Sequence, residues 1–197
     1  SERISVIPNV VDRDFESDNY IDSKKAIFVG RFEENKGVKE VIRAFKQMDS
    51  GIRDEWTLDI YGSGTLQEEV QELIADEEDI EIDYCSYDDL PEVYESAEVL
   101  IHASKYTEPF SRKWLEAMAS STAIICSTNP SSKDVLGNVA SLYDPFSRRE
   151  LVDTMNEVFS DEKLRREMAE RGRNELYNYV PQNVIPQYID LYSQVAE

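Results

Sequence analysis

The sequence predicts an α/β fold in which a doubly wound parallel sheet is flanked by helices. Up to about residue 144, short apolar runs rich in β-formers alternate with amphipathic stretches of helical period. The connections between them are short, which is typical of βαβ units. Several runs are apolar on both faces, as expected for strands that helices cover from both sides.

The expected strands are brief and their boundaries are marked by turn-forming residues. We expect them at residues 4–8, 26–30, 57–62, 79–85, 98–103, 123–127 and 140–144. Between them we expect helices at residues 37–48, 65–76, 89–97 and 112–120. In the first of these helices, Val38, Val41, Ile42 and Phe45 recur at the spacing of one helical face. After residue 147 the pattern is helical only, over 147–160, 161–180 and 181–197.

Length, charge and cysteine content exclude some classes of function. The 197 residues suit one sizeable domain or two small ones, and a formal charge of −20 argues against nucleic-acid binding. The two cysteines, Cys85 and Cys126, lie in apolar stretches and predict buried thiols rather than a disulfide framework or a zinc site. There is no signal-like segment or long apolar run, so we expect a cytoplasmic protein. The abrupt, strand-like start predicts a piece of something longer.

Ligands of such sheets bind at the carboxyl ends of the strands, where strand order reverses. After the expected strand at 26–30, Gly30 permits close approach of a ligand, and Arg31 and Lys36 flank the turn into the next helix. Cations at a helix N-terminus favour a phosphate site. The alternative is a solvated loop in which these cations neutralise Glu33 and Glu34.

A second candidate follows the expected strand at 98–103. Glu108 opens the loop and Glu116 lies about one turn into the helix, where both could accept hydrogen bonds from ligand hydroxyls. The backbone N–H groups of Phe110, Ser111 and Arg112 should point to the same place. The alternative is that Glu108 serves the helix dipole and Glu116 is simply exposed.

Other candidates are weaker. His102, the one histidine, is better interpreted as packed or hydrogen-bonded than as a base. The D-x-D spacing at 12–14 is common in so acidic a chain, and G-x-S-x-G, the phosphate-loop signature and G-x-G-x-x-G are absent. The basic stretch 163–173 could touch a membrane or a partner, but its interleaved acids favour a solvated face.

Several residue runs together resemble the C-terminal, donor-binding domain of GT-B-type retaining glycosyltransferases of the family 4 (group 1) kind. Each run is a weak signal alone, but their order matches the family's over nearly the whole chain. They are VIPNVVDRDF, FVGRFEENKGVKEVIRAF, LDIYGSGTLQEEV, LPEVYESAEVLIHAS, EPFSRKWLEAMASSTAIICS, DVLGNVASLYDPFSRREL and EKLRREMAERGRNELYNYV. The resemblance implies a Rossmann-like donor domain, one half of the GT-B fold, over residues 1–197.

The resemblance also implies roles. Glu108 would face the donor sugar and Glu116 the ribose, while Arg31 and Lys36 would hold the diphosphate of a UDP- or GDP-sugar. Gly30, Phe110, Ser111 and Arg112 would complete donor binding, without a required metal or other cofactor. The acceptor, a glycan or lipid-linked molecule, would bind an N-terminal domain that is missing here. The full-length protein could also associate peripherally with a membrane.

The chain departs from the family pattern at several positions. Val10 and Ser111 stand where glycine is usual, and Arg112 replaces an apolar residue. The altered glycines motivate an alternative, a non-catalytic sugar-nucleotide-binding or scaffold relative that kept the fold. Another GT-B enzyme, such as a sucrose- or trehalose-related synthase, is a third reading. A phosphorylase is least favoured, because no pyridoxal-binding lysine motif is evident.

Overall fold

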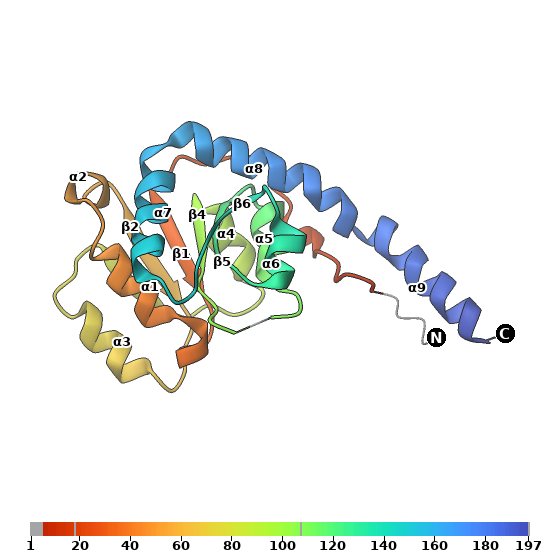
Figure 1. Cartoon of the computed structure of the whole chain (residues 1–197), viewed down its shortest axis with the longest axis horizontal. Coiled ribbons are helices and arrows are strands. Elements are labelled where there is room, and N and C mark those ends of the chain that lie inside the picture. Colours follow the sequence, from red (N-terminus) through yellow and green to blue (C-terminus); the bar gives the residue numbers. More distant parts are fainter. Residues whose placement is uncertain (1–5, 18, 107, 197) are drawn as a thin grey trace.

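The computed structural model describes residues 6–17, 19–106 and 108–196. In them lies a six-stranded, all-parallel sheet in the order β3-β2-β1-β4-β5-β6 (Figure 1). The strands are β1 (Lys25–Val29), β2 (Thr57–Tyr61), β3 (Ile80–Asp83), β4 (Val99–His102), β5 (Ala123–Ser127) and β6 (Ala140–Tyr143). Strand order reverses between β1 and β4, so the predicted doubly wound sheet is confirmed, with its switch point there.

Alternation along the strands divides the core into two layers. Ala26 and Phe28 of β1 face one layer, whereas Ile27 faces the other. The first layer is completed by α1 (Val38–Phe45), α3 (Gln67–Ile74) and α7 (Arg148–Ser160). The second is completed by α4 (Leu90–Glu95), α5 (Arg112–Ala119) and α6 (Pro130–Leu136). This explains why β1, β4 and β5 are apolar on both faces.

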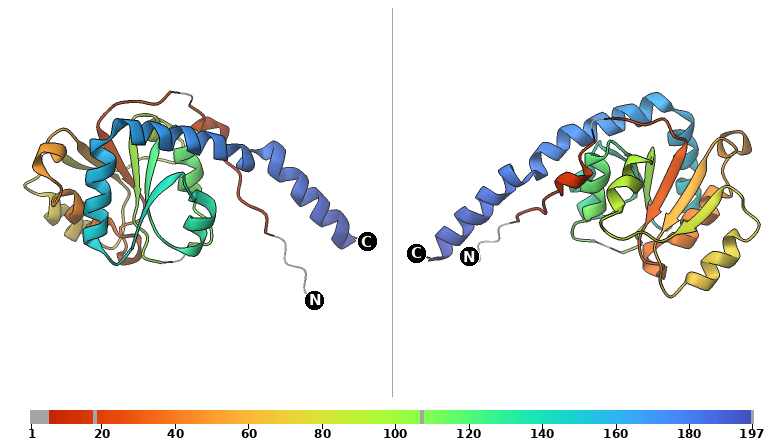
Figure 2. Two further views of the ribbon diagram at one scale, coloured as in Figure 1. Left: turned by 45° about the horizontal axis from the view of Figure 1, so that its top comes forward. Right: turned by 180° about the vertical axis from the view of Figure 1, so that it is seen from behind.

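The C-terminal part is helical, as predicted. After α7 come α8 (Glu162–Leu176), the 3-10 turn Tyr177–Tyr179 and α9 (Pro181–Ala196). Helix α8 packs on α5 and β5, whereas α9 projects away from the body of the molecule (Figures 1 and 2).

The expected strand at residues 4–8 is wrong over 6–8, which have no regular structure; residues 4 and 5 lie outside the described part. No strand of the described sheet pairs with this segment, and Val6 is exposed. Residues 6–8 instead line a groove together with residues of α8 and α9, and farther along the chain the Val11 N–H donates to the Tyr179 carbonyl at 3.2 Å.

Two helices were not anticipated, α2 (Ser50–Arg53) and α6. Helix α6 begins at a capping box, in which the Asn129 side chain accepts from the Ser132 N–H and the Ser132 hydroxyl accepts from the Asn129 N–H. Pro130 follows at the first helical position. The run NPSS contains these signals, but the weakly apolar sequence after it hides the helix.

Gly37 makes a turn that positions the loop after β1. Its φ is +75°, and a Cβ there would lie 2.2 Å from the Ala103 carbonyl oxygen. Gly37→Ala is therefore expected to lower the free energy of unfolding by at least about 1–3 kcal/mol. Gly51→Ala is the matched control, because nothing lies within 4 Å of its Cβ position and it occupies a helix. Urea unfolding should show this control neutral or stabilised; equal losses at both sites would contradict the account.

Candidate functional site

The loops after β1 and β4 meet at the carboxyl edge of the sheet, because these two strands are neighbours. Backbone contacts hold the loops together: the Lys105 N–H donates to the Asn35 carbonyl at 2.8 Å, and Gly37 abuts Ala103. Two segments about 70 residues apart in the chain are thus fixed side by side, as the switch point requires.

Lys36 and Glu108 form an ion pair across these two loops. Their side chains are only 14% and 11% exposed. The second Glu108 oxygen, Oε2, lies 3.4 Å from His102 Nε2. Burial alone would raise the pKa of Glu108, but its contacts with His102 and the Lys36 ammonium hold that pKa well below the usual range. Glu108 is therefore a fixed carboxylate.

The buried His102 side chain contacts Glu108 on the side away from solvent. Burial lowers the pKa of His102 against the opposing pull of Glu108, so the imidazole is neutral. With its proton on Nε2 it donates to Glu108, and Nδ1 then faces Cys126 Sγ at 3.5 Å. The ring packs edge-on against Trp114. The structure bears out the interpretation of His102 as a packed, hydrogen-bonded residue, and of Cys126 as a buried thiol. The same prediction is wrong for Cys85, which is only half-buried because it follows β3 at the edge of the sheet.

Glu116 occupies a separate niche on α5 and is buried rather than exposed. Its Oε2 accepts from the Tyr94 hydroxyl at 3.0 Å, and Oε1 lies 3.8 Å from Arg112. Burial raises the pKa of Glu116, although Tyr94 and Arg112 oppose the rise. Arg112 also stacks over the Tyr87 ring, with its guanidinium carbon 4.8 Å from the ring centroid. In the described structure Glu116 makes no direct contact with Lys36 or Glu108.

Arg31 is mostly solvent-exposed and pairs with Glu33 at 2.7 Å. This matches the alternative of a cation neutralised within its own loop. Arg31 nevertheless lines a cleft of about 260 Å³ with Gly30, beside Tyr61 and Cys85 at the ends of β2 and β3. Arg31 and Lys36, which were expected to act together, lie at the same edge of the sheet but pair with different carboxylates. Lys36 and Glu108 are in direct contact.

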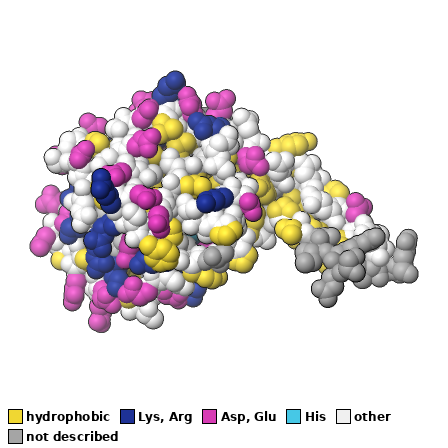
Figure 3. Space-filling model, viewed as in Figure 1, with side chains coloured by type: hydrophobic (Ala, Val, Ile, Leu, Met, Phe, Trp, Pro, Cys, Tyr) yellow, Lys and Arg dark blue, Asp and Glu magenta, His cyan; other side chains and the backbone are white. Residues whose placement is uncertain are grey.

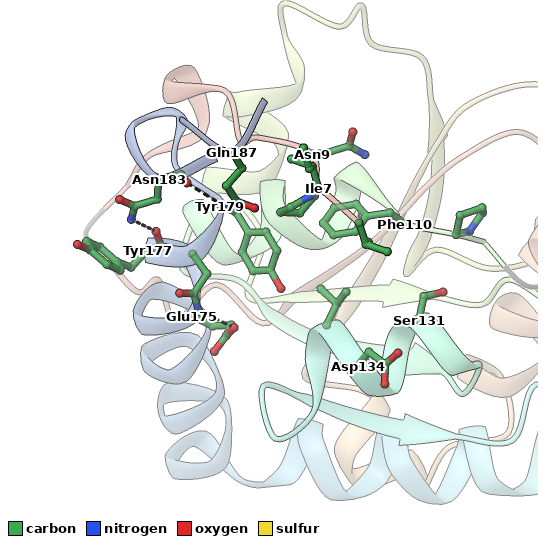
Figure 4. A pocket seen from close by; sticks show the side chains of 15 residues that line it. Ile7, Asn9, Phe110, Ser131, Asp134, Glu175, Tyr177, Tyr179, Asn183 and Gln187 are labelled. Atoms are coloured by element: carbon green, nitrogen blue, oxygen red, sulfur yellow. Dashed lines mark hydrogen bonds between the residues drawn. The ribbon is translucent and has the colours of Figure 1, made fainter. Parts of the chain in front are cut away.

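Phe110 and Ser111 precede α5. Ser111 is its N-cap, but the Ser111 side chain makes no capping hydrogen bond. The Trp114 N–H donates to the Ser111 carbonyl at 3.3 Å, which leaves the Arg112 and Lys113 N–H groups without a partner inside the helix and available to an anion. Phe110 packs against Trp114 and Tyr179. Figure 4 shows Phe110 and Tyr179 beside a larger groove, of about 770 Å³, that α6 and the segment around Ile7 also line.

Lys113 is a site residue that the sequence reasoning missed. A Cβ placed on Gly30 would lie 3.0 Å from Lys113 Nζ, so this side chain crosses from α5 to the end of β1. Burial lowers its pKa, with attraction from Glu108 and Glu116 and repulsion from Lys36 and Arg31 acting on it. The available signal was its place in sequence, five residues after Glu108 and three before Glu116.

Within the described residues, no cluster of three His, Cys, Asp or Glu side chains could hold a metal ion. In the same part of the chain, no helix is long and apolar enough to cross a membrane. Acidic side chains are spread widely over the face shown in Figure 3. The site edge therefore carries a local group of cations on a molecule of strongly negative charge.

The family model described as "Glycosyl transferases group 1" matches residues 12–175. The chain belongs to this family. The matched range includes every candidate site residue from Gly30 to Glu116. Group 1 glycosyltransferases use nucleotide-sugar donors, so the nucleotide-sugar-binding domain expected from the sequence is confirmed at that level.

Two curated relatives are similar to this group 1 domain. The uncharacterized glycosyltransferase MJ1607 of Methanocaldococcus jannaschii is 26% identical over 184 residues, 89% of this chain and 46% of the relative. O-antigen chain mannosyltransferase B of Escherichia coli is 24% identical over 172 residues, 85% of this chain and 45% of the relative. The chain spans less than half the length of either relative.

Solved structures confirm the fold. The C-terminal domain of the group 1 family protein LpcC from Francisella tularensis aligns with a TM-score of 0.73 at 21% identity, covering 85% of this chain and 97% of that domain. Alr3699/HepE of Anabaena, in complex with UDP and glucose, aligns with a TM-score of 0.84 at 17% identity, covering 96% of this chain and 57% of that one. This chain therefore has the Rossmann-like architecture of one half of a GT-B glycosyltransferase.

Proposed function

We propose that this chain is the donor half of a retaining hexosyltransferase that uses a UDP- or GDP-sugar. The acceptor, a glycan or lipid-linked molecule, would bind a second, N-terminal domain. The observation that carries the proposal is the contact of Lys36 with Glu108 at the switch point, close to the start of α5, where the Arg112 and Lys113 N–H groups have no partner inside the helix. Such crevices are where α/β sheets bind ligands.

The proposed catalysis depends on stabilising the charge of the leaving group. A departing nucleoside diphosphate gains negative charge as the sugar bond breaks, and Lys36 and Arg31 would stabilise it without an obligatory metal. The α5 N–H groups, from Ser111 onward, would bind phosphate oxygens. Glu108, held ionised by its contacts, would accept hydrogen bonds from sugar hydroxyls.

Glu116 would accept hydrogen bonds from the ribose, since it lies one turn deeper on the same helix as the proposed phosphate-binding N–H groups. Gly30 leaves room for the donor at the end of β1, and the neighbouring cleft beside Tyr61 and Cys85 suits a flat base. Two similarities support the donor class: the HepE complex contains UDP and glucose, and the E. coli relative is named a mannosyltransferase.

Titration calorimetry with UDP and GDP tests the proposal. At least one should bind with a Kd below about 1 mM, corresponding to about −4 kcal/mol or stronger. Absence of heat with both at millimolar concentration, from a chain that circular dichroism shows to be folded, would contradict a donor site. In the full-length protein, unchanged sugar transfer by Glu108→Ala would instead favour a non-catalytic role for this edge.

A further inference from the structure

Among Arg31, Lys36, Arg112 and Lys113, Lys113 is the cation for which the structure shows no carboxylate within ion-pair distance. Arg31 pairs with Glu33, Lys36 with Glu108, and Arg112 lies near Glu116. The Lys113 side chain is half-buried between α5 and the end of β1. A shielded ammonium that lacks a counter-ion is costly unless something else supplies the negative charge.

The carboxylates nearest Lys113 already have cations beside them. Glu108 pairs with Lys36, Glu116 lies near Arg112, and Asp12, another acid close to Glu116, lines a groove with Arg112. The whole chain carries −20, so its long-range field would repel an anion, and an anion here must be held by contacts at the site. A small, multiply charged anion would supply the negative charge that Lys113 lacks.

The position of the Lys113 ammonium indicates where such an anion would bind. Lys113 Nζ lies close to Gly30, since a Cβ at residue 30 would be 3.0 Å from it. Lys113 also belongs to the first turn of α5, where the Arg112 and Lys113 N–H groups have no partner inside the helix. An anion between the end of β1 and the start of α5 would meet both kinds of donor.

We propose that Lys113 binds the diphosphate of the nucleotide donor, as a third cation alongside Arg31 and Lys36. This inference rests on the proposed function and adds a residue to it. The ammonium replaces its missing counter-ion with a phosphate oxygen when the donor binds. Lys113 should therefore contribute to the affinity for the nucleoside diphosphate and not to that for the nucleoside alone.

The test compares the binding affinities of Lys113→Met and of the unchanged chain. One ligand is UDP or GDP, whichever binds, and the other is the matching nucleoside; NMR chemical shifts of the protein measure both affinities. Loss of a charge-assisted hydrogen bond should weaken diphosphate binding at least about tenfold. Nucleoside affinity should stay within about twofold. Lys163→Met, which removes an equal charge from a side chain 86% exposed, is the control and should change neither affinity beyond about twofold.

The outcomes separate the two proposals. Equal diphosphate affinity in Lys113→Met and the unchanged chain would overturn the role of Lys113 while leaving the donor site intact. Equal weakening for diphosphate and nucleoside would also overturn it, since that indicates a structural role. Failure of the unchanged chain to bind either diphosphate would defeat both proposals. Loss of fold is not expected, because removing an unpaired, half-buried charge should keep or raise the Tm.

Discussion

Replacing Arg165 by methionine is expected to lower the free energy of unfolding by about 3–5 kcal/mol. Arg165 and Glu98 are fully buried and form an ion pair between α8 and the residue preceding β4. Arg165 also donates to the carbonyls of Val158 and Phe159 at 2.8 and 2.7 Å, and its guanidinium stacks over Trp56. In the variant the buried Glu98 carboxylate loses its cation and keeps only the Tyr20 hydroxyl and the Lys24 N–H as donors, while the Val158 and Phe159 carbonyls lose the donor that Arg165 supplies.

Urea unfolding at pH 7 measures this effect, with Lys163→Met on the same helix as the control. The control removes an exposed i,i+4 pair and should cost no more than about 0.5 kcal/mol. Adding Glu98→Gln to Arg165→Met should restore part of the loss, because the uncompensated charge disappears. A loss below about 1 kcal/mol for Arg165→Met would show that this pair does not hold α8 to the sheet.

Lys36→Met is expected to weaken UDP or GDP binding by at least about tenfold, the value of a charge-assisted hydrogen bond. It should also lower the free energy of unfolding at pH 7 by about 1–3 kcal/mol, since Glu108 loses its ammonium partner. Calorimetry and urea unfolding report the two effects separately. Arg43→Met, from the neighbouring helix α1, is the control and should show neither.

The stability effect of Lys36→Met should depend on pH. The pKa of Glu108 in the folded chain lies below its unfolded value of about 4.3, so its stabilisation is present above that value and is lost as pH falls towards the folded pKa. The difference between the two proteins should thus be largest near neutral pH and shrink below about pH 4. A difference that grows on acidification would contradict the ion pair.

The sheet could be predicted from the sequence because its signal is local. Apolar runs such as 26–30 and 123–127 alternate with amphipathic helices, and this pattern admits little besides a parallel sheet. The carboxyl-edge positions of Lys36 and Glu108 followed from that topology. The segment 6–8 was misassigned because Val6 and Ile7 look strand-like, although a strand also needs a partner that only the tertiary structure can supply.

Side-chain partners were less predictable than positions. Arg31 forms an ion pair with Glu33 in the structure. This pairing depends on side-chain rotamers, which the spacing of residues in the sequence does not determine. Glu116 is buried against Tyr94, a contact between helices 22 residues apart in sequence. Lys113 was missed because the sequence does not show which way a side chain early in the expected helix runs, whereas its close approach to Gly30 in the structure shows where the ammonium lies.

A crystal structure of the chain with UDP or GDP tests the central claim most directly. The diphosphate is expected between the end of β1 and the start of α5, with oxygens within about 3 Å of Lys36, Lys113 and the first N–H groups of α5. A diphosphate bound elsewhere, for instance in the groove beside Phe110 and Tyr179, with Lys36 still closed on Glu108, would contradict it.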